Sequence, residues 1–398
     1  MAKVRVTRSL SIPDPLVVSR CRKIPELGPR VLFFSGGSAL TGLSRTLKNY
    51  THNSIHLVTP FDSGGSSAKL RAAFAMPAIG DLRSRLMALA DETVLGHPEI
   101  SGLFTYRLPI DQPRDRLLDR LQQMVAGKDP LVAAILNPMR RLICNNLGYF
   151  LDAMPEDFDL SGASIGNLIL AGGYINNHRD LEPILFLFSK LVNVQGTVRA
   201  IVDDDLHLRA VLEDDSLVVG QHRLTGKEMP RLAAPIRTLG LCNSATDPTE
   251  ATVQVRGRNR DLIEEADLIC YPQGSFYSSL IANLLPDGVG RSISRNDCPK
   301  VFIPNQGSDP EQLGMTLADS ITTLVDYLKR DDVENLQVSD LLNFIIVDSA
   351  SGQYPGGIPY PLLDSLGIQV IDLDLIHSSA DGYYDNERLV AALLSLSR

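Results

Sequence analysis

Near the start of the chain, two apolar strands in succession each run into a loop of small residues. The first strand spans 31–34 and is followed by the first loop, 35–42, and by a predicted helix at about 43–50. The second strand spans 54–59 and leads into the second loop, 60–67. In an open parallel sheet both loops emerge at the carboxyl edge, where ligands of such folds bind. This pattern therefore predicts an α/β architecture with a ligand site at one edge of the sheet.

Strands and helices alternate along most of the remaining chain. Further strands are predicted at 236–241, 268–271, 301–304, 343–348 and 369–372, and helices at 82–91, 113–128, 130–153, 162–175, 182–191, 311–328 and 386–395, with a helix end at 261–266. Such alternation favours a Rossmann-like, doubly wound α/β fold with a mainly parallel sheet.

The domain organisation follows from the same pattern. Short strands at 198–202, 206–212 and 216–220 indicate a small β-rich insertion, a subregion at about 194–235. We expect residues 30–398 to form a single α/β domain that includes this subregion. Residues 1–29 form an N-terminal extension, in which an apolar alternation at 3–10 is compatible with an edge strand.

Composition excludes several classes of protein. Lys and Arg number 38 against 47 Asp and Glu, a net charge of −9 without a basic block, so we expect no nucleic acid and no anionic membrane as partner. The five cysteines are scattered and form no CxxC pair, which is typical of reduced thiols in a cytoplasmic protein. No apolar span approaches the roughly 20 residues of a membrane helix.

A third loop of the same type, 272–279, follows the predicted strand 268–271. Loops of Gly, Ser and Thr offer backbone N–H groups and short hydroxyls, which suit the phosphates of a nucleotide. A Walker-type ATPase is disfavoured, because Gly42 is followed by Leu43 and Ser44 rather than by lysine. An ordinary NAD-linked dehydrogenase is disfavoured as well, since the first loop is not GxGxxG and lacks the usual downstream carboxylate.

Three charged residues near these loops are candidates for chemistry. Asp62, at the end of the second strand, is suited to hold magnesium or to accept a proton from a substrate hydroxyl, although capping the glycine turn is the simpler role. Asp81 is a candidate helix cap. Arg83 is a candidate to bind an anionic substrate through two hydrogen bonds.

The chain resembles the CofD / YvcK family. The resemblance rests on Gly36-Gly37 with Thr41-Gly42-Leu43-Ser44, on 58–71, on Gly80-Asp81-Leu82-Arg83, on 162–168, on the β region 206–220, on Ala266-Asp267-Leu268-Ile269, on 274–279 with Asn283-Leu284-Leu285, and on Asn305-Gln306-Gly307. These motifs occur in the family's order from about residue 30 to the end of the chain. The resemblance implies a Rossmann-like fold, a nucleotide bound across the loops and commonly a homodimer.

The family contains two kinds of function. CofD-type members are 2-phospho-L-lactate transferases that use a nucleotide with magnesium, and YvcK-type members are gluconeogenesis or morphogenesis factors that bind a nucleotide-sugar. The resemblance implies Asp62 and Arg83 as catalytic residues, with Asp62 also binding magnesium, and a set of residues that bind the nucleotide and its phosphates. These are Gly36, Gly37, Thr41, Gly42, Gly64, Gly65, Ser66, Ser67, Asn167, Gly274, Ser275, Tyr277, Ser278, Asn283 and Asn305. The expected partners are GTP, GDP or a nucleotide-sugar and a small anionic substrate.

The sequence also departs from the family pattern. Ser63 replaces the second of two paired aspartates, Ala163 replaces a histidine, and Pro272-Gln273-Gly274 replaces a glycine-proline-glycine. The first loop carries the additional residues Ser38, Ala39 and Leu40. Two hypotheses remain open: a transferase of the 2-phospho-L-lactate transferase type, and a non-catalytic regulator that binds a nucleotide or nucleotide-sugar. A structural protein without a ligand is a third, weaker reading.

Overall fold

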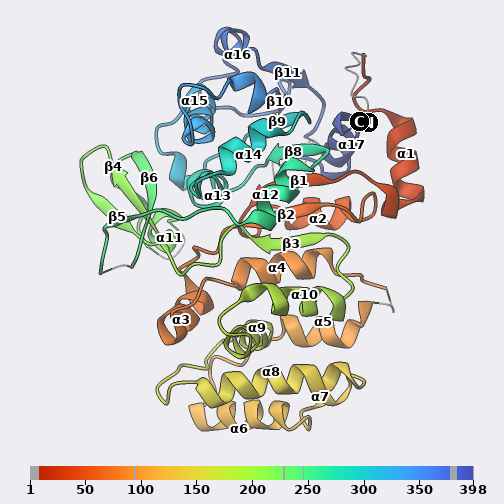
Figure 1. The fold of residues 1–398 in the computed structure, drawn as a ribbon, viewed down its shortest axis with the longest axis vertical. Coiled ribbons are helices and arrows are strands. Elements are labelled where there is room, and N and C mark those ends of the chain that lie inside the picture. The colour runs from red at the N-terminus through yellow and green to blue at the C-terminus, as the bar shows by residue number, and fades with distance from the viewer. Residues whose placement is uncertain (1–8, 94–95, 227–228, 245, 377–382, 398) are drawn as a thin grey trace.

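The structure is a computed structural model that describes residues 9–93, 96–226, 229–244, 246–376 and 383–397. It is tall, with a large β-sheet and its helices in the upper part of Figure 1 and a stack of helices below. Most of the alternation at 3–10 lies outside the described residues. Within those residues, no helix is both long enough and apolar enough to cross a membrane.

The large sheet has seven strands in the order β11-β10-β9-β8-β1-β2-β3, and every neighbouring pair is parallel. The strands are β1 (Val31–Ser35), β2 (Ile55–Val58), β3 (Thr197–Ala200), β8 (Leu268–Tyr271), β9 (Lys300–Phe302), β10 (Phe344–Val347) and β11 (Gln369–Asp372). β1 lies between β2 and β8, so the three loops of the sequence analysis emerge side by side at the carboxyl edge. The predicted Rossmann-like α/β fold is confirmed.

Both faces of this sheet are covered, which explains why its central strands read as continuous apolar runs. On one face, Val31 and Phe33 pack with α2 (Thr41–Leu47) and α17 (Asn386–Leu396). On the other face, Leu32 and Phe34 join a core with α12 (Gly257–Glu264), α14 (Val289–Arg295) and α15 (Leu317–Lys329). Shorter helices are α13 (Ala282–Leu284) and α16 (Tyr360–Leu366), and a π-helix spans Phe276–Ile281.

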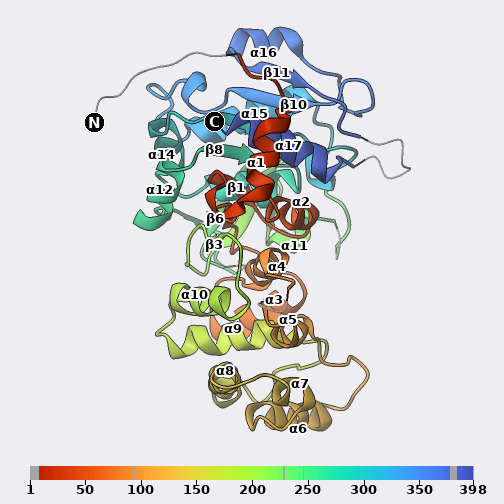
Figure 2. The ribbon, with the colours of Figure 1, turned by 90° about the vertical axis from the view of Figure 1, so that its right-hand side faces the viewer.

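The N-terminal extension contains a helix that the sequence analysis did not predict. Its residues form α1 (Pro15–Lys23), capped by Asp14 and followed by a 3-10 turn, Pro25–Leu27. Val17 and Cys21 are buried in the same core as α17, and α1 lies beside α17 in Figure 2. Packing against a distant helix stabilises this short segment, and such a partner is invisible in the local pattern.

The helix stack comprises α3 (Gly65–Phe74), α4 (Gly80–Leu89), α5 (Pro98–Thr105), α6 (Arg114–Val125), α7 (Pro130–Ala133), α8 (Met139–Ala153), α9 (Ile165–Asn176) and α10 (Leu181–Leu191). The helix predicted over 130–153 is wrong in its continuity, because it is broken into α7 and α8. Pro138 cannot donate a helical hydrogen bond, and α8 begins directly after it. The helix predicted over 311–328 begins instead at Leu317, after a 3-10 turn at Pro310–Gln312.

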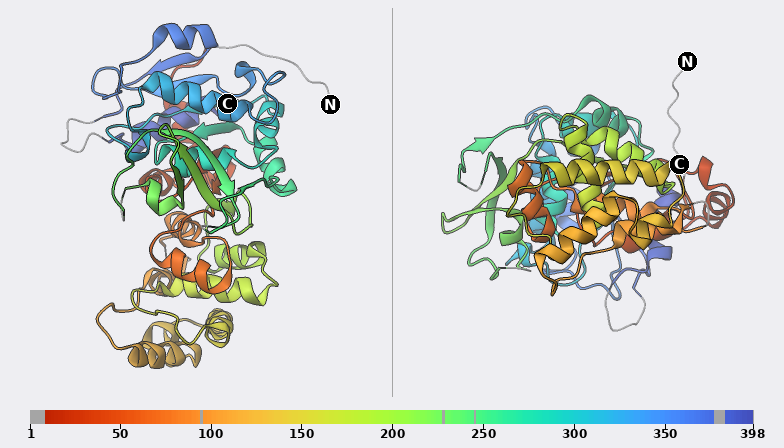
Figure 3. Two further views of the ribbon diagram at one scale, coloured as in Figure 1. Left: turned by 90° about the vertical axis from the view of Figure 1, so that its left-hand side faces the viewer. Right: turned by 90° about the horizontal axis from the view of Figure 1, so that it is seen from below.

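A second, antiparallel sheet stands beside the large one at the left of Figure 1 and faces the viewer in the left panel of Figure 3. Its order is β5-β4-β6-β7, with β4 (His207–Leu212), β5 (Leu217–Val219), β6 (Ile236–Cys242) and β7 (Glu250–Ala251). The subregion expected at 194–235 is divided differently: β3 belongs to the large sheet, and β6 extends the small one. Leu208, Ala210 and Leu239 bury the small sheet against the core of the large sheet. This packing fixes the short helix α11 (Gln221–Leu224) near the loops.

Candidate functional site

A cavity of about 820 Å³ opens at the carboxyl edge of the large sheet. It is lined by the three loops, by α4, by the segment after β9 and by α11 of the small sheet. The cavity brings together many of the residues expected at a binding site: Gly36, Gly37, Gly42, Asp62, Gly64, Gly65, Ser66, Ser67, Arg83, Asn167, Gly274, Ser275 and Asn305. Its volume falls in the range of small-molecule sites, near the upper end.

The first loop has backbone donors without a partner in the protein. In the described part of the chain, no carbonyl or side chain accepts a hydrogen bond from the N–H groups of Gly37, Ser38 or Ala39. These residues line the cavity. Unpaired N–H groups in such a loop suit an anion.

A buried arginine supports the first loop from behind. The Arg85 guanidinium is 2 % exposed, donates to Ser44 Oγ over 2.6 Å, and donates to the carbonyls of Gly36 and Gly37 over 3.1 and 3.2 Å. Burial lowers the pKa of Arg85 to about 10, against the opposing effect of the Asp81 carboxylate. Arg85 therefore stays positively charged at neutral pH and adds positive potential behind the unpaired amides.

The second loop is ordered by its own side chains. Asp62 Oδ1 accepts a hydrogen bond from the Gly64 N–H over 3.0 Å, which is the turn-capping role weighed for it. Arg71 is 4 % exposed in its side chain, donates to the Phe61 and Asp62 carbonyls and bridges to Asp205 at 2.7 Å. This arginine ties the loop after β2 to the segment that enters the small sheet.

A hydrogen-bonded chain leads from the second loop to Arg83. Asn167 donates through Nδ2 to Ser66 Oγ over 3.0 Å and accepts through Oδ1 from Arg83 Nε over 2.8 Å. Burial lowers the pKa of Arg83 to about 10; nearby Arg107 acts in the same direction and Asp81 opposes it. Arg83 remains a cation at neutral pH. Together with the exposed Arg107, it gives this end of the cavity two positive charges.

The third loop differs, because backbone N–H groups in it and directly after it donate hydrogen bonds to other side chains of the protein. Asn305 Oδ1 accepts the Gly274 N–H over 2.7 Å, and Asp309 Oδ2 accepts the Phe276 N–H over 2.7 Å. Glu311 Oε2 accepts the N–H groups of Tyr277 and Ser278 over 2.9 and 2.7 Å. A carboxylate at a helix N-terminus is stabilised by the same N–H groups that would bind a phosphate.

Four of the expected binding residues do not line the cavity. Tyr277 and Ser278 are buried at the N-terminus that Glu311 caps. Asn283 is buried and donates to the carbonyls of Ser35 and Ser279, which joins β1 to the π-helix. Thr41 begins α2, and its N–H donates to the Ser38 carbonyl. In the structure, all four of these residues make hydrogen bonds to other parts of the fold.

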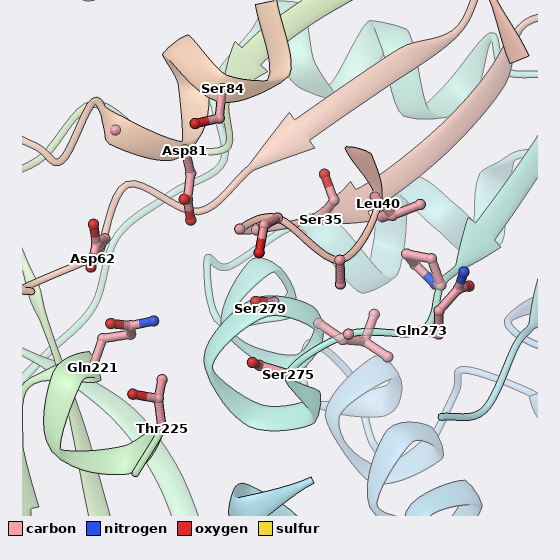
Figure 4. Close-up of a pocket in the computed structure, with 18 of the residues that line it drawn as sticks. Ser35, Leu40, Asp62, Asp81, Ser84, Gln221, Thr225, Gln273, Ser275 and Ser279 are labelled. Atoms are coloured by element: carbon pink, nitrogen blue, oxygen red, sulfur yellow. The ribbon is translucent and has the colours of Figure 1, made fainter. Parts of the chain in front are cut away.

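Several cavity residues were not among the predicted site residues. They are Ser35, Ser84, Arg107, Gln221, His222, Thr225, Gln273, Ser279 and Gln306, with Arg85 behind the first loop. Asp81, predicted as a helix cap, also lines the cavity; that prediction is wrong, because the N-cap of α4 is Ile79 and no side chain of the described residues caps the helix. In Figure 4, Gln221 of α11 and Thr225 directly after this helix lie on the side of the cavity opposite Gln273. The α11 residues sit in a polar turn, and only the packing of the small sheet brings them to the cavity.

Magnesium was expected at Asp62. Among the described residues, no group of three or more His, Cys, Asp or Glu stands together to hold a metal ion. Magnesium is often bound by one or two carboxylates plus the phosphates of a substrate. Asp62 and Asp81 both line the cavity and provide such a set. The residues therefore fit a magnesium ion shared with a bound ligand, and they do not form a cage made by the protein alone.

Comparison with known proteins assigns the family. A family model described as 2-phospho-L-lactate transferase CofD matches residues 31–356. The chain belongs to the CofD family. This confirms the resemblance seen in the sequence. The matched range includes the three loops, the small sheet and most of the cavity lining, whereas Tyr383, Tyr384 and Asn386 of that lining lie after it.

Relatives of this CofD-family chain include proteins named gluconeogenesis factor. It is 27 % identical over 373 residues to the gluconeogenesis factor of Bacillus subtilis, covering 92 % of this chain and 97 % of the relative. It is 30 % identical over 299 residues to a putative gluconeogenesis factor of Nostoc sp., covering 75 % of this chain and 52 % of that protein.

A solved structure shares the fold. The crystal structure of a UPF0052 family protein from Bacillus halodurans has a TM-score of 0.66 and 23 % identity, with 92 % of the CofD-family chain and 99 % of the other covered. At 23 % identity, this similarity supports the fold only.

Proposed function

We propose that this CofD-family protein binds a nucleotide or a nucleotide-sugar in the cavity, with its phosphates at the first loop. The observation that carries the proposal is the set of unpaired N–H groups at Gly37, Ser38 and Ala39, backed by the buried Arg85 cation. Phosphate binding by backbone donors and a fixed positive charge is a general feature of nucleotide sites. The volume of about 820 Å³ leaves room for a sugar or a second substrate beside the phosphates.

A thermal-shift panel tests this proposal. GDP, GTP, UDP-glucose and inorganic pyrophosphate are added to the protein with and without magnesium. A ligand present at 100 times its Kd adds roughly 2.7 kcal/mol to the free energy of unfolding, so the midpoint rises by several degrees. Adenosine, which lacks phosphate, is the negative control. If no phosphorylated compound raises the midpoint at millimolar concentration, the nucleotide proposal is wrong.

A second candidate function is group transfer, of the 2-phospho-L-lactate transferase type. It is favoured by Asp62, Asp81 and Arg83, which share the cavity with the first loop. In such a reaction Arg83 would neutralise an anionic substrate, and Asp62 would orient an acceptor hydroxyl and accept its proton. Asp62 and Asp81 would hold magnesium, which supplies charge neutralisation on the phosphates.

Product analysis separates transfer from regulation. The protein is incubated with magnesium, a guanosine diphosphate ester of L-lactate as the activated donor and an acceptor that carries a hydroxyl group; products, including the released GMP, are sought by mass spectrometry. Tight nucleotide binding without product supports a regulator, in keeping with the name that the curated relatives carry. If product forms, Asp62→Asn should lower turnover at least tenfold, while the nucleotide affinity measured without magnesium stays within about threefold, since Arg85 and the first loop are untouched. Asp204→Asn, an exposed aspartate, is the matched control.

A further inference from the structure

Ser63 and His222 form a hydrogen-bonded pair that joins the second loop to the small sheet. Ser63 Oγ lies 2.8 Å from His222 Nδ1, and the backbone N–H of His222 donates to the same oxygen over 3.3 Å. The two residues are 159 positions apart in the sequence. His222 lies in α11 and lines the cavity.

The position of the ring proton depends on which partner of this pair donates. Ser63 Oγ accepts the His222 N–H and can accept a second hydrogen bond, and its own hydroxyl proton has one acceptor among the described residues, Nδ1 of His222. When the hydroxyl donates to Nδ1, a neutral imidazole carries its proton on Nε2. No described residue accepts a hydrogen bond from Nε2.

The backbone leaves room for this arrangement at Gly220, which has a φ of +100°. A Cβ at Gly220 would lie 2.9 Å from His222 Cε1 and 3.2 Å from Ser63 Oγ. A larger residue here would press on both partners, so the glycine permits the ring and the hydroxyl to meet.

We propose that His222 binds the ligand of this cavity by donating from Nε2 to a phosphate or carboxylate oxygen, and that Ser63 is the positioning residue that fixes this tautomer. This inference rests on the proposed function. The family pattern has an aspartate where this chain has Ser63. A carboxylate at that position would accept a hydrogen bond from Nδ1 and would place a negative charge beside the bound anion, whereas a serine that donates to Nδ1 adds no charge and leaves Nε2 as a donor. The replacement thus removes a negative charge from this part of the cavity wall.

Calorimetry with GDP, UDP-glucose and pyrophosphate, each with magnesium, tests the assignment on four full-length variants. In His222→Gln, the side-chain amide can place an N–H near the position of Nε2, so affinity should stay within about threefold. In His222→Asn, the amide reaches Ser63 but not the ligand, so affinity should fall about ten- to hundredfold, the loss of a hydrogen bond to a charged oxygen. Ser63→Ala should give a smaller loss, about three- to tenfold.

His207→Asn is the matched control, because His207 lies on β4 of the same small sheet and does not line the cavity. Its affinity should equal that of the wild type. Urea unfolding of each variant separates folding from binding. If His222→Gln and His222→Asn bind alike, whether both at the wild-type level or both weakened, the assignment of Nε2 is overturned. If the wild type binds none of the three probes, the proposed function itself has failed, which is a different result.

Discussion

The first and third loops look alike in sequence and are used differently by the fold. Both follow a buried central strand, and both are rich in glycine and serine. In the first loop, Gly37, Ser38 and Ala39 line the cavity, their N–H groups donate to no backbone carbonyl of the described residues, and a buried cation lies behind them. The third loop and the π-helix after it give their N–H groups to Asn305, Asp309 and Glu311.

The difference shows that a turn of small residues can offer N–H groups to an anion, and that this anion can belong either to the protein or to a ligand. At the third loop the anions come from the protein, as two carboxylates in the segment after β9. At the first loop the nearest carboxylate to Gly37 is that of Asp81, and in our proposal the ligand supplies the anion for the loop amides. In this proposal the phosphates of a nucleotide bind at one loop rather than at two.

The largest expected effect tests the support of the first loop. Arg85→Ala should lower the free energy of unfolding by about 3 to 5 kcal/mol, because Ser44 Oγ and two loop carbonyls lose their donor and a large cavity remains. Urea denaturation measures this loss. Arg107→Ala removes an exposed arginine from the same cavity and should change stability by about 0.5 kcal/mol at most. Equal losses in the two variants would show that the buried cation does not hold the loop.

The second prediction concerns Glu311, the buried carboxyl group that accepts N–H groups directly after the third loop. Burial, together with the charge of Asp309, raises the pKa of Glu311 to about 7 from its ordinary value of 4.5. A carboxyl group with a raised pKa contributes stability that is fully present below the unfolded-state pKa and is lost as pH rises through the folded-state pKa. The wild type should therefore lose up to about 3 kcal/mol between pH 4.5 and 8, relative to Glu311→Gln.

Denaturation of both proteins across that pH range provides the measurement. Glu334→Gln, at an exposed glutamate, serves as the control and should follow the wild type at every pH. A constant difference between wild type and Glu311→Gln would mean that Glu311 does not take up a proton in this range.

The smallest effects separate two neighbouring glycines of the first loop. A Cβ at Gly36 would lie 2.5 Å from Ser279 Oγ and 2.9 Å from Ser279 Cβ, so Gly36→Ala should cost about 1 to 3 kcal/mol of stability. A Cβ at Gly37 would meet nothing nearer than the Asp81 carboxylate at 3.9 Å. Gly37→Ala should leave stability unchanged and weaken GDP binding several-fold, because the methyl group enters the space beside the unpaired amides. The opposite pattern would contradict our account of this loop.

The strands of the fold could be read from the sequence because each leaves a local signal. β1, β2 and β8 are short apolar runs that end in glycine or proline turns, and all three were predicted within one or two residues. The assignment of β3 to the large sheet could not be read in this way. A four-residue strand with alternating burial fits either sheet, and only its parallel pairing with β2 decides between them.

The loops of the candidate site could be predicted from the sequence, whereas the part of the cavity lined by α11 could not. Asp62, Arg83 and Asn167 lie in motifs close to the loops or shared with the family, so the sequence found them. His222 has no motif around it, and its place depends on a hydrogen bond to a serine 159 residues away. Arg85 was missed because an arginine in a helix is normally solvated, and its burial depends on carbonyls that the first loop turns toward it.

The sequence by itself determined the parallel α/β sheet and the family, and it predicted a candidate site at the carboxyl edge, because these depend on local periodicity and on motifs in order. Only the tertiary structure decided which glycine loop is open to a ligand. Whether a backbone N–H is free depends on whether a carboxylate elsewhere in the chain reaches it, and Glu311 reaches the amides of Tyr277 and Ser278 from more than 30 residues away. That distance lies beyond any local pattern.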